Sequence, residues 1–150
     1  MKTLVLSFSE LSINQLYAVL RLRSEVFVVE QNCVYQDIDN RDLDAMHVLF
    51  VDNNGVLLAY ARLLPADLTY STPSIGRIIV APQARGNNLG KQLVTFCVKT
   101  CERLWANQDI KIGAQCYLEN FYNSFGFLRV SEDYLEDGIP HLDMLLSAQK

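Results

Sequence analysis

The stretch Ser74–Thr100, SIGRIIVAPQARGNNLGKQLVTFCVKT, predicts a strand, a turn and a helix in direct succession. β-Branched residues dominate positions 75–80 and favour a strand. Pro82 ends that strand because proline cannot donate to a sheet ladder. Residues 85–90, RGNNLG, are typical of a turn. The helix that follows presents one face at helical spacing, formed by Leu89, Leu93, Phe96, Cys97, Thr100, Cys101 and Leu104.

The turn at 85–90 has the features of an anion site. A turn of small residues that opens a helix leaves N–H donors without partners, and these donors point toward one spot. The helix dipole adds partial positive charge there. Arg85 and Lys91 bring two full positive charges close to the same spot. The sequence therefore predicts a phosphate-binding turn.

Composition narrows the class of protein. The chain has 150 residues, half of them hydrophobic and a fifth charged, which fits one packed domain. The net charge of -4 gives no basic stripe, so we expect no nucleic-acid partner. The apolar runs are too short to cross a bilayer, and no secretory leader is expected. The four cysteines lack CxxC spacing, so we expect no metal site and a reduced, cytoplasmic protein.

The first half of the chain predicts one strand, one long helix and a hairpin. Residues 3–8 form the strand, and Ser12 begins a helix that runs to about Glu30. Residues 31–44 carry four aspartates without periodicity and predict a loop with at most one short helical turn. The Asn-Gly pair within 53–55 then predicts a hairpin between strands 48–51 and 56–64.

The second half adds shorter elements. We expect a buried strand at 110–116, a short helix at 118–125 that ends at Gly126, and strands at 127–130 and 141–146. A turn at Asp137-Gly138 precedes the last strand. The order is β-α-β-β-β-α-β-α-β-β. It favours a single mixed α/β (α+β) domain, with helices covering a largely antiparallel sheet.

Three interpretations of the central turn can be compared on its residues. An NTPase P-loop needs Ser or Thr after Gly-Lys, and Gln92 stands there instead. A dinucleotide fingerprint needs GxGxxG, and only Gly86 and Gly90 are present. A plain strand-to-helix turn without a ligand is the third interpretation.

A wider pattern resembles the GNAT acetyltransferases. Val80, Pro82 and the block Arg85–Gly90 are similar to the family's acetyl-CoA segment, and Asn120–Phe127 is similar to its YxxxGF ending. Further blocks resemble the ElaA-like branch: Leu22-Arg23, Val26–Asn32, Tyr35–Asp39 and Asp137–His141. The resemblance covers the whole chain, residues 1–150. It implies one GNAT-like domain with about six to seven strands and about four helices.

The resemblance also implies a reaction and its site. Acetyl-CoA would be the co-substrate, a primary amine the acceptor, and the protein a monomer or homodimer. Tyr122 would donate a proton to the departing CoA thiolate, although a tyrosine in the core is the structural alternative. A backbone N–H near Ile79 or Val80 would polarise the thioester. The cofactor-binding residues implied are Ile78, Ile79, Val80, Arg85, Gly86, Asn87, Asn88, Leu89, Gly90, Lys91 and Gln115.

Two departures from the family pattern affect the chemistry. Asn88 replaces a glycine, and asparagine tolerates left-handed backbone better than most residues. Arg77 occupies the position where many relatives have a glutamate base, and arginine cannot take a proton. Arg77 could pair with an aspartate or bind an anionic group of the acceptor. The base stays open among His47, His141, Glu30 and a water chain.

The acceptor is open as well. The acidic loop is expected to be a solvated face, and as a charged surface it would favour a cationic acceptor. An acyltransferase acting on a hydroxyl or a protein lysine is a further alternative. Because no base is evident, a non-catalytic module that binds acyl-CoA or a protein partner is the hypothesis from a different class.

Overall fold

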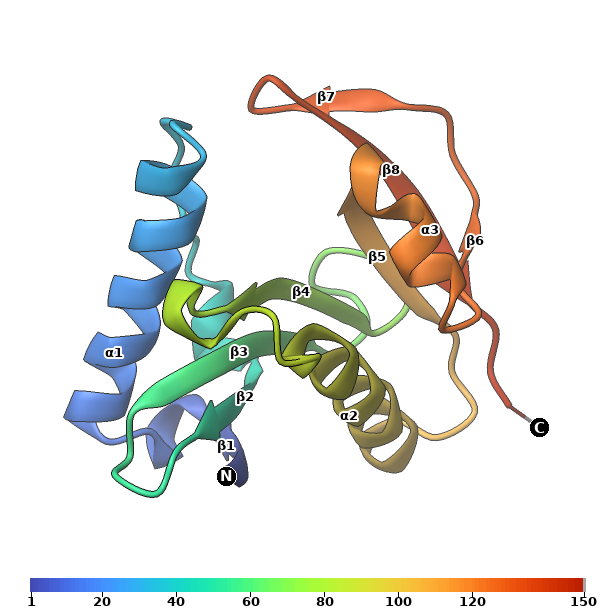
Figure 1. Cartoon of the computed structure of the whole chain (residues 1–150). Helices are drawn as coiled ribbons and strands as arrows, with labels where there is room; N and C mark the ends of the chain where they lie inside the picture. The colour runs from blue at the N-terminus through green and yellow to red at the C-terminus, as the bar shows by residue number, and fades with distance from the viewer. Residues whose placement is uncertain (150) are drawn as a thin grey trace.

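The computed structural model describes residues 1–149, which fold into eight strands and three α-helices (Figure 1). The helices are α1 (Ile13–Arg23), α2 (Leu89–Leu104) and α3 (Glu119–Asn123). The strands are β1 (Lys2–Ser7), β2 (Met46–Val51), β3 (Leu57–Leu64), β4 (Ser74–Val80), β5 (Ile110–Gln115), β6 (Leu128–Arg129), β7 (Tyr134–Glu136) and β8 (Ile139–Leu146). None of the helices within this range is long and apolar enough to cross a membrane.

The strands form one sheet in the order β1-β2-β3-β4-β5-β8-β6, and β7 pairs with β8. Every pairing is antiparallel except that of β4 with β5. The predicted mixed, largely antiparallel sheet is therefore confirmed. The strand absent from the prediction is β7, which has only three residues, mostly exposed, and lacks an apolar pattern. The turn predicted at Asp137-Gly138 joins it to β8, with both residues at positive φ.

Both faces of the sheet are buried, and the side chains of β2 alternate between the two faces. Val48 and Phe50 belong to the core beneath α2, whereas Leu49 and Val51 belong to the core beneath α1. Successive residues of a strand point to opposite faces, so this continuous apolar run serves two cores. Helix α1 covers one face, and α2 with α3 covers the other.

The first helix extends to Glu30, as predicted, but in two parts. Ser12 and Gln15 form a capping box: the Ser12 hydroxyl accepts from the Gln15 amide at 3.0 Å, and the Gln15 side chain accepts from the Ser12 amide at 2.8 Å. Residues Ser24–Glu30 continue α1 with π-helical geometry. Such segments occur frequently at functional sites. The short helical turn expected in the acidic loop lies at Arg41–Asp44.

Strands β4 and β5 separate almost at once. Their parallel register contains a single pair, Ser74 with Lys111, next to a hydrogen bond of 3.0 Å from the Lys111 amide to the Pro73 carbonyl. Beyond it the two strands spread apart (Figure 1). A bulge in β4 lies here, where Arg77 has a φ of 49° and the β3–β4 register shifts between Tyr60 and Arg62. Beyond Ser74, β4 therefore has no pairing with β5.

Candidate functional site

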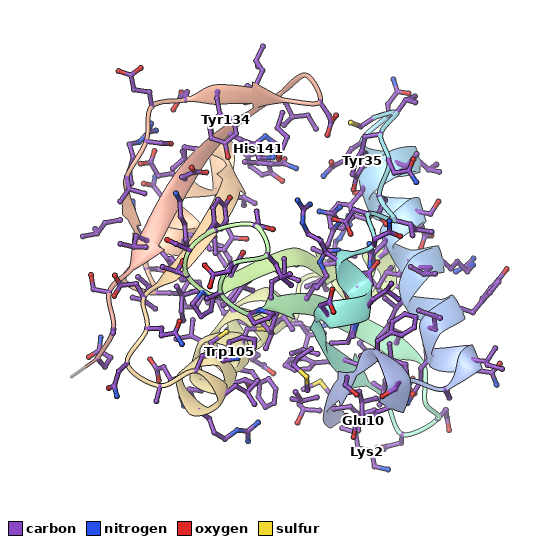
Figure 2. All side chains as sticks on the ribbon, turned by 180° about the vertical axis from the view of Figure 1, so that it is seen from behind. Lys2, Glu10, Tyr35, Trp105, Tyr134 and His141 are labelled. Atoms are coloured by element: carbon purple, nitrogen blue, oxygen red, sulfur yellow. The ribbon has the colours of Figure 1, made fainter. Side chains whose placement is uncertain are left out.

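A cleft of about 150 Å³ lies where β4 and β5 separate. Its lining comes from four parts of the chain: the π-helical segment and the loop after it, β4, the β5–α3 region and the β7–β8 hairpin. The lining includes Phe27, Tyr35, Arg77, Gln115, Tyr122 and His141. Figure 2 shows Tyr35 on one side of the opening and His141 on the other. Three of the four blocks that resemble the ElaA-like branch, Val26–Asn32, Tyr35–Asp39 and Asp137–His141, therefore contribute to one cavity.

The main chain of β4 offers alternate groups to this opening. The Ala81 amide donates to the Leu58 carbonyl of β3 at 2.8 Å, and the register pairs Tyr60 with Ile79. Because main-chain groups alternate in direction along a strand, Ile79 also faces β3, while Ile78 and Val80 face away from it. Ile79 is buried in the core beneath α1. The structure thus presents Ile78 and Val80 to the opening, whereas Ile79 faces elsewhere.

Tyr122 forms part of the cleft wall although only 6% of its surface is exposed. Its ring packs edge-to-face against Phe121 and Phe127, with centroid separations of 5.1 and 6.2 Å. Burial raises the pKa of the phenol well above its usual range. Tyr122 therefore keeps its proton at neutral pH and has one to donate, while also serving the core. The role of proton donor and the role of core residue are therefore compatible for Tyr122.

The turn before α2 has the geometry expected of it. Gly86 and Asn88 both have left-handed backbone, with φ of 88° and 64°. Asn88, which replaces a glycine of the family pattern, therefore adopts the left-handed conformation that glycine favours. The turn lines a shallow second cavity, and the first-turn amides of α2, which have no partners within the helix, lie at the same place. That cavity is lined by Val80, Arg85, Gly86, Asn88, Leu89, Gly90, Lys91 and Phe121. Asn87 instead turns its side-chain amide toward the Ala84 carbonyl, at 3.4 Å.

Arg85 has a protein partner at this turn. Its guanidinium forms two hydrogen bonds with the Glu30 carboxylate, at 2.7 and 3.0 Å, and a third with the Val80 carbonyl at 3.3 Å. The hydrogen bonds from Arg85 lower the pKa of Glu30. Glu30 is thus an ionised partner of Arg85 at the edge of the phosphate turn and does not line the cleft. The geometry removes it as a base.

The acidic loop is the clearest correction to the sequence analysis. It was expected to be a solvated face, yet three of its four aspartates lie in a largely buried network with arginines from α1, β3 and β4, and Asp44 stays exposed outside it. We call this set the arginine network: Arg23, Asp37, Asp39, Asp42, Arg62 and Arg77. Arg23 is fully buried, and its guanidinium bonds the Asp37 and Asp42 carboxylates at 2.9 and 2.6 Å. These carboxylates are neutralised and do not form an acidic surface for a cationic acceptor.

Arg77 joins the arginine network to the cleft. Its Nε donates to the Asp37 carboxylate at 2.8 Å, and its guanidinium lies over the Tyr35 ring at 5.7 Å from the centroid. The Tyr35 hydroxyl donates to the same carboxylate at 2.9 Å. Of the two roles considered for Arg77, pairing with an aspartate is the one that the structure contains. No spacing rule could have revealed this contact, which spans forty residues.

The two histidines have different surroundings. His47 is 1% exposed, and both of its ring nitrogens have partners, the Tyr60 hydroxyl at 2.7 Å and the Asp42 carbonyl at 2.9 Å. Burial is the main cause of its lowered pKa. It supports the arginine network and does not reach the cleft. His141 lines the cleft opposite Tyr35.

The remaining candidates also separate. Gln115 lines the cleft, and its amide lies 3.4 Å from the Gln31 side-chain oxygen across the opening. All four cysteines are free thiols; Cys33 reaches the cleft, whereas Cys97 and Cys101 are buried in the core. Cys116 does not line the cleft. Arg23 and Arg62 could not be recognised as site residues in the sequence, because no neighbouring residues mark an arginine as buried.

Comparison with known proteins now decides the family. The family model described as "Acetyltransferase (GNAT) domain" matches residues 9–148. The chain belongs to the GNAT acetyltransferase family. It is 51% identical to protein ElaA of Escherichia coli K12 over 141 residues, 93% of this chain and 92% of that protein. The resemblance to the ElaA-like branch is thereby confirmed.

Solved structures agree with this family assignment. An acyl-CoA N-acyltransferase from Pseudomonas aeruginosa superposes with a TM-score of 0.92 at 40% identity, covering 97% of this chain and 99% of that one. The crystal structure of Escherichia coli ElaA gives 0.90 at 48% identity, with the same coverage. This GNAT member therefore has the fold of its family, and the family's acyl transfer from CoA is the activity that the fold supports.

Proposed function

We propose that this GNAT member transfers an acetyl group from acetyl-CoA to a primary amine by direct attack in a ternary complex. The separation of β4 from β5 supports this proposal most. It leaves Ile78 in the cleft beside Tyr122, on a strand that leads through Val80 directly to the amide turn of α2. Anion site, peptide-like groove and proton donor thus follow one another along the path a CoA thioester would take.

The pyrophosphate and the pantetheine arm of CoA would each have matching groups in the protein. The pyrophosphate would lie on the amides from Gly86 to Lys91, with the charge of Lys91 beside it. The pantetheine amides would pair with Ile78 and Val80 in place of a neighbouring strand. Gln115 would bond the pantetheine arm from β5. Arg85 would contribute to phosphate binding by exchanging one of its Glu30 contacts for a phosphate oxygen.

The chemistry follows from these positions. The amine nitrogen attacks the thioester carbon, and the carbonyl oxygen becomes an oxyanion held by a β4 amide, a contact worth about 3 kcal/mol. The C–S bond then breaks, and the sulfur takes the Tyr122 proton. The amide nitrogen releases its extra proton to the Tyr122 phenolate. Tyr122 is restored, and the products are the N-acetyl amide and CoA thiol.

Binding is the first test of this proposal. Thermal unfolding is measured with acetyl-CoA and, separately, with adenosine as a fragment that lacks the pyrophosphate and thioester. Acetyl-CoA at 100 times its Kd should add about 2.7 kcal/mol to the free energy of unfolding. Adenosine should shift the transition much less. If millimolar acetyl-CoA leaves the transition unchanged, the proposal fails.

Tyr122→Phe tests the proton donor. The variant removes only the hydroxyl, so turnover should fall by about 10²–10⁴-fold while the acetyl-CoA shift stays near that of the wild type. Tyr117→Phe is the matched control, because Tyr117 lies in the adjacent helical turn and is 77% exposed. Thiol release from acetyl-CoA reports turnover. Wild-type turnover in Tyr122→Phe would leave the residue with its core role only.

One observation favours a second candidate function. Arg77, at the position where many relatives have a base, is bonded to Asp37 and cannot take a proton. A module that binds acyl-CoA without turning it over would tolerate this arrangement. Binding of acetyl-CoA with no thiol release across a broad amine panel would establish that function in place of catalysis.

A further inference from the structure

The β7–β8 hairpin holds a second titratable group in the cleft. His141 is opposite Gln115 in the β5–β8 register, and both side chains line the cavity that contains Tyr122. Figure 2 shows His141 on the inner side of the hairpin, across the opening from Tyr35. It is therefore placed beside the same cavity as the proposed proton donor.

Two contacts fix the orientation of the His141 imidazole. Its Nδ1 lies 2.7 Å from the Ile139 carbonyl, a contact that requires a proton on Nδ1. Its ring stacks on Tyr134 at a centroid distance of 6.0 Å, and the Tyr134 hydroxyl is anchored to Asp143 at 2.7 Å. The neutral ring is thus the tautomer with its lone pair on Nε2. A base needs this lone pair in a fixed direction.

Glu136 completes the arrangement. Its carboxylate lies 3.4 Å from Nε2 and remains largely exposed. A carboxylate at this distance can accept a hydrogen bond from Nε2 once that nitrogen carries a proton. It would therefore stabilise His141 after the ring has taken a proton. The other charged or titratable residues that line the same cavity are Cys33, Tyr35, Arg77, Tyr122 and Asp137, and Tyr134 stacks on the ring.

We propose that His141 is the general base for the amine acceptor and that Glu136 is a positioning residue that stabilises the imidazolium. The inference rests on the proposed function. Nε2 takes one proton from the substrate ammonium, which frees the nitrogen lone pair for attack on the thioester carbon. The imidazolium later returns that proton to solvent. Tyr122 still supplies the proton for the thiolate, so the two residues serve opposite ends of the transfer.

The other candidates are engaged elsewhere. Both ring nitrogens of His47 have partners inside the arginine network. Glu30 is bonded to Arg85 outside the cleft. A water chain is the remaining competitor, and it predicts that removing the His141 imidazole changes little.

The test uses the full chain with acetyl-CoA and three probe amines: phenethylamine, cadaverine and Nα-acetyl-lysine. Thiol release is followed from pH 5 to 9 with the amine that gives the highest kcat/KM. His141→Gln should lower kcat about 100-fold or more, abolish the acidic limb of the pH profile and keep the acetyl-CoA thermal shift. Added imidazole should restore part of the activity of His141→Ala.

Glu136→Gln provides a second measurement that does not depend on the folding of a His141 variant, because Glu136 is exposed. Loss of the carboxylate should lower kcat while leaving the KM for the amine near the wild-type value, and Glu132→Gln, an exposed neutral-for-charged change between β6 and β7, should leave both unchanged. A His141→Gln variant with near wild-type kcat, or a Glu136→Gln variant with unchanged kcat, would overturn the inference. Absence of thiol release by the wild type with all three amines would overturn the proposed function itself.

Discussion

The two walls of the cleft use charged residues in opposite ways. On one wall the arginine network buries its charges: the side chains of Arg23, Arg62 and Asp42 are all less than a tenth exposed. On the other wall the β7–β8 hairpin leaves Glu136 60% exposed, and its neighbour Asp133 equally so. Buried charges must be paired and hydrogen-bonded, so they determine structure. Exposed charges stay available for a substrate or a proton.

The arginine network explains how a polar loop becomes part of a site. Residues 31–44 offer little apolar surface to bury, so hydrophobic packing alone would not position them. Arginines from three separate elements instead bind the loop's aspartates and one main-chain carbonyl, that of Asp37. This places Tyr35 against Arg77 at the edge of the cleft. Ion pairs therefore hold one wall in place, whereas the other wall carries exposed charged side chains.

The largest expected effect comes from breaking the buried wall. Arg23→Ala leaves Asp37 and Asp42 without a main partner in a buried site, which should cost about 3–5 kcal/mol in the free energy of unfolding. Urea denaturation at pH 7 measures it. Arg21→Ala is the matched control, because Arg21 lies on the same helix and is exposed. Equal stability of the two variants would contradict the contrast between the walls.

Acid should weaken the same wall by a smaller amount. Burial opposes ionisation of Asp39, but the hydrogen bonds and charge of Arg62 outweigh it and lower its pKa. Because the folded pKa lies below the unfolded value, this stabilisation is present above about pH 4 and is lost as pH falls through the folded pKa.

The variant Asp39→Asn makes this dependence measurable. It should be less stable than the wild type at pH 7, and the difference should shrink between pH 5 and pH 3. Urea midpoints at these pH values report the change. Asp44→Asn, an exposed change in the same loop, should follow the wild-type curve at every pH. Parallel curves for Asp39→Asn and the wild type would show that the network does not depend on this carboxylate.

The smallest effect is expected at an exposed ion-pair cluster around Arg129 of β6, outside the cleft lining. Arg129 contacts Glu119 at 2.9 Å and Asp133 at 2.6 Å, distances as short as those within the arginine network. Because solvent screens exposed pairs, Arg129→Ala should leave the urea midpoint close to that of the wild type. A loss as large as that of Arg23→Ala would mean that the number of contacts, and not burial, determines their strength.

Local patterns allowed much of the fold to be predicted. The strand–turn–helix at 74–104, the Asn-Gly hairpin and the Ser12 capping box all depend on residues close together in sequence, and the structure contains each of them. Errors lie where local signal is weak. Strand β7 is short and exposed, and the aspartates of the loop look alike whether they are solvated or paired.

The candidate site divides in the same way. The phosphate turn and Tyr122 could be proposed from motifs because backbone geometry and a single hydroxyl are local properties. The partners of Arg77, Arg85 and Glu30 could not, because their contacts join positions 38 to 55 residues apart. The separation among candidate bases also needed the tertiary structure, because His141 lines the cleft and His47 does not, whereas composition treats the two alike.

By itself, the sequence indicated the family, the order of elements apart from β7, and the turn suited to a phosphate. These depend on residue type, spacing and backbone preference, which act over a few positions. Tertiary structure alone decided which charges are buried and paired, which main-chain groups of β4 face the opening, and which histidine meets the cleft. Electrostatics and burial act between neighbours in space, and the chain has to fold before those neighbours exist.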